Sequence, residues 1–277
     1  MQGTSAAIAT EAGWPFPLVR IADVPVAAVT REDTVHHVGT CLAQGEGGWI
    51  VTVNVDHLQR CQADPEIAAM YHEASLVVAD GMPVLWAARV AGARLPERVA
   101  GSDLVWLLAE RAARDGRSLF LLGGSAGAAE AAAARLRVRW PGLRIAGTSS
   151  GMVSSPPSAA EIETLAAELR AAAPDLVYVA LGAPKQEQLI RALRCHLPCT
   201  WWIGVGIGLS FVAGDVSRAP RLMQRLGLEW LHRLGQEPRR LARRYLIDDL
   251  PFTLRLLASA LHSRLRAVAN PRRRSID

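Results

Sequence analysis

Six short, almost continuously apolar runs recur along the chain, and stretches with helical periodicity separate them. The runs are Trp49–Val53, Leu76–Ala79, Ser118–Leu122, Leu143–Ala146, Leu176–Leu181 and Trp201–Val205. A strand that is apolar on both sides must be covered on both faces, as happens in parallel sheets flanked by helices. The alternation therefore predicts an α/β fold with a mostly parallel sheet between helices.

The segments between the runs predict helices near residues 58–73, 83–92, 102–115, 126–139, 159–173 and 185–196. Ser102 and Ser125 are expected N-caps, and Pro156-Pro157-Ser158 leads into another helix. Residues 1–20 are expected to form a flexible N-terminus and residues 21–216 the α/β domain. Residues 217–277 show no strand pattern and are expected to form a helical appendage.

The appendage is strongly basic although the whole chain carries a formal charge of only +5. From Ser217 onward there are 14 arginines and five acidic residues, a net charge of +9, which leaves −4 for the rest. Such an asymmetry indicates an anionic partner: a membrane surface, a phosphorylated ligand or nucleic acid.

Apolar residues of the appendage recur with helical spacing. They are Leu250, Leu254, Leu257, Leu261, Leu265 and Val268, and Arg255, His262 and Arg266 fall on the opposite side. A basic amphipathic helix of this kind can lie in a membrane interface. It can equally pack on the α/β domain or against a second subunit, so a homo-oligomer stays open. Because the arginines lie on helices with a continuous leucine face, nucleic acid is not expected as a partner.

Composition argues against several classes of protein. Mean hydropathy is +0.15, and no apolar run reaches the roughly 18 residues of a membrane helix. The first residues lack the basic and apolar regions of a secretory signal. The four cysteines form no CxxC pair and are expected to be reduced, buried thiols rather than disulfides or zinc ligands. A cytoplasmic location is therefore expected.

Polar residues and glycines follow the apolar runs, at the sheet edge where ligands of open α/β sheets bind. The candidates for substrate binding there are Thr52, Asn54, Gly123, Lys185, Gln186 and Gly206. Asp80 ends the run LVVA and could act as a general base, or it could belong to an ordinary Asp-Gly turn. Lys185, the only lysine of the chain, lies at a predicted helix start that also favours anions.

The glycine clusters do not indicate a dinucleotide cofactor. GGSAG and GVGIG both follow strands, but neither has the G-x-G-x-x-G spacing, and neither is followed about 20 residues later by an acid that ends a second strand. An NAD-dependent oxidoreductase is therefore a weak alternative. No metal motif is present either, so no cofactor and no metal are expected.

Several segments together resemble the WecG/TagA/CpsF family of bacterial glycosyltransferases (glycosyltransferase family 26). The resemblance runs from about Ile21 to Leu250, and its most specific pieces are ERVAGSDL, GAPKQE and RAP…GLEW..RL..EP. It implies a Rossmann-like fold (GT-E type) whose C-terminal appendage brings the enzyme to the inner face of the cell membrane. It also implies an inverting, metal-independent transferase that moves a sugar from a UDP-sugar donor to an undecaprenyl-diphosphate-linked acceptor, in cell-surface polysaccharide, exopolysaccharide or teichoic-acid-type synthesis.

The resemblance also implies roles for single residues. Asp80 corresponds to the catalytic base, while Thr52 and Gln186 line the substrate site. Three appendage arginines would face phosphate groups: Arg233, Arg240 and Arg243. One displacement needs only one base, and cations with helix N-termini can stabilise the departing UDP.

The sequence departs from the family pattern at Ser210, where many members have an aspartate. The donor sugar therefore stays open among N-acetylmannosamine, its uronate and glucose, and so do the acceptor sugar and the pathway. A non-catalytic membrane-surface protein of the same fold is the main alternative.

Overall fold

The computed structural model describes the chain except residues 1–7, 10–13, 152, 226 and 270–277, and gives only the backbone of residues 221, 225, 240 and 267–269. Its centre is a six-stranded sheet in the order β5-β4-β9-β8-β6-β7, in which every pair of neighbours is parallel. The strands are β4 (Gly48–Val53), β5 (Leu76–Ala79), β6 (Ser118–Gly123), β7 (Arg144–Ser149), β8 (Leu176–Ala180) and β9 (Trp201–Gly204). All six predicted strands are confirmed, and with them the Rossmann-like α/β class.

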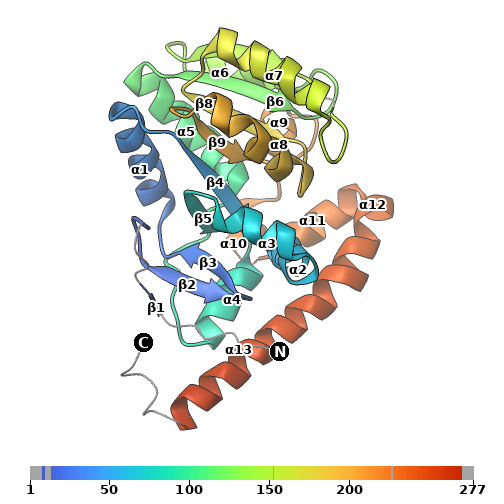
Figure 1. Ribbon diagram of the computed structural model, residues 1–277. Helices are drawn as coiled ribbons and strands as arrows, with labels where there is room; N and C mark the ends of the chain where they lie inside the picture. The colour runs from blue at the N-terminus through green and yellow to red at the C-terminus, as the bar shows by residue number, and fades with distance from the viewer. Residues whose placement is uncertain (1–7, 10–13, 152, 226, 270–277) are drawn as a thin grey trace.

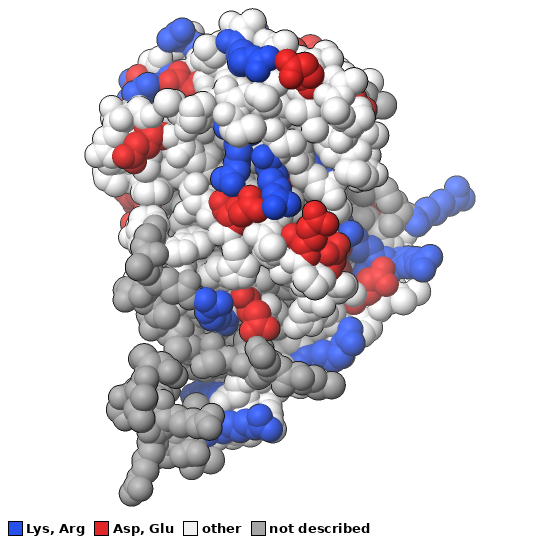
Figure 2. All heavy atoms as spheres, in the orientation of Figure 1, with Lys and Arg blue, Asp and Glu red and all other residues white. Residues whose placement is uncertain are grey.

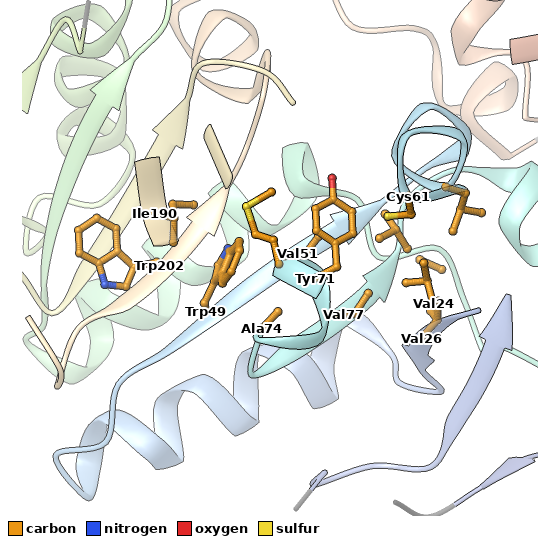
Figure 3. Packing of buried hydrophobic residues seen from close by; sticks show 14 of the residues in the cluster. Val24, Val26, Trp49, Val51, Cys61, Tyr71, Ala74, Val77, Ile190 and Trp202 are labelled. Carbon is orange, nitrogen blue, oxygen red and sulfur yellow. The ribbon is translucent and has the colours of Figure 1, made fainter. Parts of the chain in front are cut away.

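Helices cover both faces of the sheet, which explains why its strands other than β7 are largely apolar (Figure 1). Alternate residues of every strand except β7 enter two separate cores, as the two-residue period of a strand requires. In β4, Trp49, Val51 and Val53 belong to one core and Ile50 belongs to the other. Figure 3 shows the first core, in which Tyr71 packs near Val51.

Each core is closed by its own set of helices. The first core receives side chains from α2 (Val55–Ala63), α3 (Pro65–His72), α4 (Met82–Val90), α7 (Ala159–Ala172) and α8 (Lys185–Leu193). The second receives them from α1 (Arg31–Ala43), α5 (Gly101–Asp115), α6 (Ala128–Arg139) and α9 (Gly208–Ala213). A short 3-10 helix, η1 (Arg194–His196), follows α8.

Several helix starts differ from the prediction. The helix expected at 58–73 is two helices, because Asp64 caps α3 by accepting the Glu66 N–H at 2.9 Å and Pro65 follows it. Ser102 and Ser125 are not N-caps: the N-cap positions belong to Ala100 and to Gly127.

The helix expected after Pro156-Pro157-Ser158 is present, and its N-cap is Ser158. Ser158 caps α7 and forms a capping box with Glu161, whose carboxylate accepts bonds from the Ser158 N–H and hydroxyl at 2.7 and 2.6 Å. These bonds, with others from Ser154, lower the pKa of Glu161 to about 2.

The N-terminal part contains a small antiparallel sheet that the sequence patterns did not predict. It consists of β1 (Ile8–Ala9), β2 (Leu18–Ile21) and β3 (Val24–Ala27). Because β2 begins at Leu18 and is mostly buried, the ordered structure starts before the expected boundary at residue 20. The rest of the expected flexible segment lies largely outside the described residues.

The appendage consists of helices in its described part, as predicted. They are α10 (Arg221–Arg225), α11 (Glu229–Gln236), α12 (Pro238–Ala242), the π-helical turn η2 (Arg243–Asp249) and the long α13 (Leu250–Ala269). Figure 1 shows α13 running across the lower part of the molecule, and α13 packs on α4. None of the described helices has both the length and the hydropathy that a membrane crossing requires.

The face of α13 that contacts the α/β domain is not the predicted leucine face. Phe252, Leu256 and Ala260 are buried against the domain. Leu254 and Leu261, by contrast, are 60% and 49% exposed. The helix thus packs on the α/β domain, as one of the alternatives allowed, but it does so through another face and leaves most of the leucine face exposed.

Cysteine burial was predicted only in part. Cys41 and Cys61 are buried, and burial raises the pKa of the Cys61 thiol to about 12. Cys195 and Cys199 are exposed free thiols, because both lie in the segment that follows α8 at the surface.

Candidate functional site

The carboxyl ends of β4, β5 and β9 bring the predicted polar residues together. The Asp80 N–H donates to the Val53 carbonyl at 2.7 Å, which places Asp80 beside the end of β4. A Cβ atom added at Gly101 would lie 3.2 Å from the Thr52 Oγ1 and 3.3 Å from the Gly204 carbonyl oxygen. The first turn of α5 therefore meets Thr52 at this edge, where its free N–H groups favour anions.

Asp80 is a partly accessible carboxyl group in a poorly hydrated place. Its pKa is raised to about 6, mainly by burial and against the attraction of Arg98, and the negative charges of Glu229 and Asp103 contribute to the rise. His57 acts in the opposite direction. A carboxylate with such a pKa is a stronger base than an ordinary aspartate and is still ionised at neutral pH.

Arg98 links Asp80 to the appendage through an ion-pair cluster. Its Nη1 lies 2.7 Å from Glu229 Oε2 on α11, and its Nη2 lies 3.3 Å from Asp103 Oδ2 on α5. Arg218 of the appendage contacts the other oxygens of both carboxylates, at 2.6 Å from Asp103 Oδ1 and 3.6 Å from Glu229 Oε1. The start of α11 is thereby held beside the candidate base.

Sequence reasoning missed this ion-pair cluster. Arg98 and Asp103 lie in ERVAGSDL, and Glu229 lies in GLEW, so both matching segments contained the signal. What could not be read from them is that residues 131 positions apart would share one charge cluster.

Gln186 is buried, and both of its polar atoms are bonded inside the protein. Its Nε2 donates to Glu187 Oε1 at 2.7 Å, and its Oε1 accepts the Gly206 N–H at 3.1 Å. Only 3% of Gln186 is exposed. The structure therefore places Gln186 beneath the loop that follows β9, where it fixes the backbone at Gly206.

Glu187 connects the Gln186 amide to His57 and Asn54 at the start of α2. Its Oε1 lies 3.7 Å from His57 Nε2, and His57 Nδ1 lies 2.8 Å from Asn54 Oδ1. Asn54 is also the N-cap of α2 and accepts the His57 N–H at 3.2 Å. The chain of contacts from Asn54 to Gly206 thus spans the ends of β4, β8 and β9.

Replacing Gln186 by leucine is expected to destabilise the fold by about 2–4 kcal/mol, because a buried carboxylate oxygen and the Gly206 N–H both lose their partner. The free energy of unfolding in urea measures this. The matched control is Gln188→Leu on the same helix, where a less buried amide contacts only Ser155 at 3.4 Å. Equal losses in both variants would contradict the role given to the Gln186 amide.

The other predicted residues line the same edge of the sheet. Lys185 is half-buried at the start of α8, and within the described residues no carboxylate pairs with it. Gly182 and Gly206 both have positive φ, and a Cβ at either would meet no atom within 4 Å. The space beside these two glycines is open, so a ligand can approach the backbone there.

Gly123 ends β6 with φ of +96° and has no such space. A Cβ there would lie 2.8 Å from the Ala180 carbonyl oxygen and 2.9 Å from Leu181 Cδ2. This glycine therefore allows β6 and β8 to approach each other at the site.

Gly123→Ala is expected to lose about 2–4 kcal/mol of stability, because strained backbone and a backbone clash add together. Gly182→Ala, which has only the unfavourable φ of +74°, should lose about 1 kcal/mol. Thermal unfolding of the two variants measures the difference, and a Gly123→Ala protein as stable as the control would contradict the packing described here.

The three predicted appendage arginines differ in their placement. Arg233 lies one helical turn after Glu229 on α11, so both occupy the same face of that helix. Arg243 is exposed in η2, and the Arg240 side chain lies outside the described residues. Arg244, which was not predicted, anchors η2 to α2 through Asp56 Oδ2 at 3.1 Å.

The sheet, the single candidate base at its carboxyl edge and the appended helices together define a Rossmann-like glycosyltransferase architecture. The model of the glycosyl transferase WecG/TagA/CpsF family matches residues 19–266, nearly the whole chain. The chain belongs to this family. Its members suggest a role in the synthesis of cell-surface polysaccharide or teichoic acid.

Proposed function

We propose that the protein transfers a sugar from a UDP-sugar to a hydroxyl of an undecaprenyl-diphosphate-linked sugar, with inversion and without a metal ion. The single observation that carries the proposal is Asp80, a carboxyl group with its pKa raised to about 6 at the carboxyl edge of the sheet. Membership of a glycosyltransferase family supports the reaction class.

In this mechanism the acceptor oxygen attacks the anomeric carbon as Asp80 takes the hydroxyl proton. The bond to the UDP oxygen breaks in the same step, so the sugar changes its configuration and UDP leaves as an anion. The first turn of α5 beside Thr52, and Lys185 at the start of α8, which has no carboxylate partner among the described residues, would stabilise that charge. Arg233, which shares a face with Glu229, would hold phosphate groups together with Arg240 and Arg243.

The appendage would place this site at the inner face of the cell membrane. Leu250, Leu254, Leu261 and Leu265 are 48–60% exposed on one side of α13, and Leu246 and Ile247 of η2 are exposed as well. An exposed apolar face in a basic segment fits an anionic lipid surface. The acceptor lipid resides there, so the same face would bring enzyme and acceptor together.

Acceptor-dependent release of UDP tests the proposal. A panel of UDP-N-acetylmannosamine, its uronate and UDP-glucose is offered with a short-chain polyprenyl-diphosphate sugar, in the presence of a chelator. Release with one donor, only when the acceptor is present, is the expected result. If folded protein releases no UDP with any of the donors and several acceptors, the result would favour a non-catalytic membrane-surface protein.

A further inference from the structure

A small cavity of about 70 Å³ lies next to α4, the helix on which α13 packs. Its apolar wall comes from Met82, Leu85 and Trp86 of α4 and from the segment that follows this helix. Arg89 and Arg94 line it as well. The cavity is far smaller than the roughly 300–1,000 Å³ of a pocket for a whole organic ligand, so it suits a single small anionic group.

The two arginines of the cavity are exposed and unneutralised. In the described part of the chain neither Arg89 nor Arg94 has a carboxylate within ion-pair distance, whereas nearby Arg98 contacts two. Unpaired guanidinium groups beside an apolar wall provide both the charge and the hydrogen-bond donors that a phosphate requires.

A third arginine joins them from the appendage. A Cβ added at Gly92, in the turn after α4, would lie 3.9 Å from both Cδ and Nε of Arg264 on α13. Arg264 is exposed too, and no acidic group in the described residues pairs with it. Figure 2 shows basic side chains at the lower end of this face.

The exposed leucine face lies on the same helix as Arg264. Arg264 lies between Leu261 and Leu265 in sequence, and these leucines are 49% and 59% exposed. Trp86, which lines the cavity, is 38% exposed, and an indole suits the boundary between headgroups and acyl chains. Gly227, between α10 and α11, packs against the same helix, since a Cβ there would lie 3.2 Å from Trp86.

We propose that this cavity binds the headgroup phosphate of an anionic phospholipid, held by Arg89, Arg94 and Arg264, with Trp86 at the level of the glycerol. The proposal rests on the membrane association given under the proposed function and adds a defined lipid site to it. The acceptor's diphosphate is a poorer fit, because Arg89 follows Met82 by seven residues, about 10 Å farther along α4 than the helix end next to Asp80.

Calorimetric titration of the full chain with dihexanoylphosphatidylglycerol, kept below its micelle concentration, tests the site without any membrane surface. Saturable binding to the wild type is expected, with at least tenfold weaker binding to Arg89→Gln/Arg94→Gln. The matched control is Arg255→Gln/Arg266→Gln, which removes the same charge from exposed positions of α13 outside the cavity and should bind like the wild type.

Three results would overturn the proposal. Absence of binding, or equal weakening in both double variants, would leave only diffuse attraction between the basic appendage and anionic lipid. Equal affinity for inorganic phosphate would assign the site to a free anion, and a raised KM for the short-chain acceptor in Arg89→Gln/Arg94→Gln would assign it to the acceptor. Lipid binding is read independently of turnover, so failure of the proposed transferase activity would be distinguishable.

Discussion

Asp80→Asn is expected to lower kcat of the proposed transfer by about 10²–10⁴-fold, because the amide cannot accept the proton of the attacking hydroxyl. Side-chain size is nearly unchanged, so donor binding should persist. Steady-state UDP release with saturating acceptor measures the loss. Asp215→Asn is the matched control. Asp215 is exposed, and its Oδ2 accepts a hydrogen bond from the Ser125 hydroxyl, after the end of β6, at 3.1 Å.

The stability of the same variant separates a chemical effect from unfolding. Burial disfavours the ionised form of Asp80, as its raised pKa shows, so a neutral amide should leave the melting temperature unchanged or raise it. Loss of activity together with a lowered melting temperature would point to a structural role. Full activity would remove Asp80 from the mechanism.

The pH dependence follows from the same carboxyl group. Only ionised Asp80 can accept a proton, so kcat/KM should fall as the pH drops through about 6. Glu229 raises this pKa by its negative charge, and Glu229→Gln should therefore move the acidic limb to lower pH. Two results would contradict the electrostatics of the site. One is a fall of kcat/KM near pH 4 in the wild type, and the other is an acidic fall at the same pH in Glu229→Gln and in the wild type.

Leu254→Glu/Leu261→Glu is expected to weaken binding to vesicles that contain phosphatidylglycerol by at least about 100-fold. Each leucine buried in the bilayer contributes about 1.5–3 kcal/mol, and the new carboxylates are repelled by anionic lipid. Both residues are exposed in the structure, so the fold should be unaffected. Vesicle sedimentation measures the change.

Val138→Glu serves as the control for that variant, because Val138 is an 83% exposed apolar residue on α6, outside the appendage. It should bind vesicles like the wild type. If the leucine variant also keeps its affinity, the exposed face of α13 has another partner, and a dimer detected by light scattering would identify that partner as a second copy.

The sheet could be predicted from the sequence because a strand that is buried on both faces appears there as a short apolar run. Every strand except the edge strand β7 is largely apolar and buried, because helices cover both of its faces. The hairpin of β2 and β3 could not be recognised in this way. Its turn is Ala22-Asp23, whose φ angles of 49° and 65° are ones that glycine or asparagine usually supplies.

The site residues that could be predicted are those that directly follow or end a strand. Thr52, Asn54 and Asp80 come at strand ends, and parallel strands place those ends at one edge. His57, Glu187 and Glu229 could not be assigned in this way, because their roles depend on contacts between separate elements. The leucine face shows the same limit: its period was visible in the sequence, but whether it faces the domain depends on how α13 packs.

The most direct test of the proposed function is the mass of the lipid acceptor after incubation with the active UDP-sugar. The account predicts that the acceptor gains one sugar residue for each UDP released, with wild-type protein and not with Asp80→Asn. UDP released without any gain in acceptor mass would show hydrolysis instead, and would contradict transfer to a lipid-linked sugar.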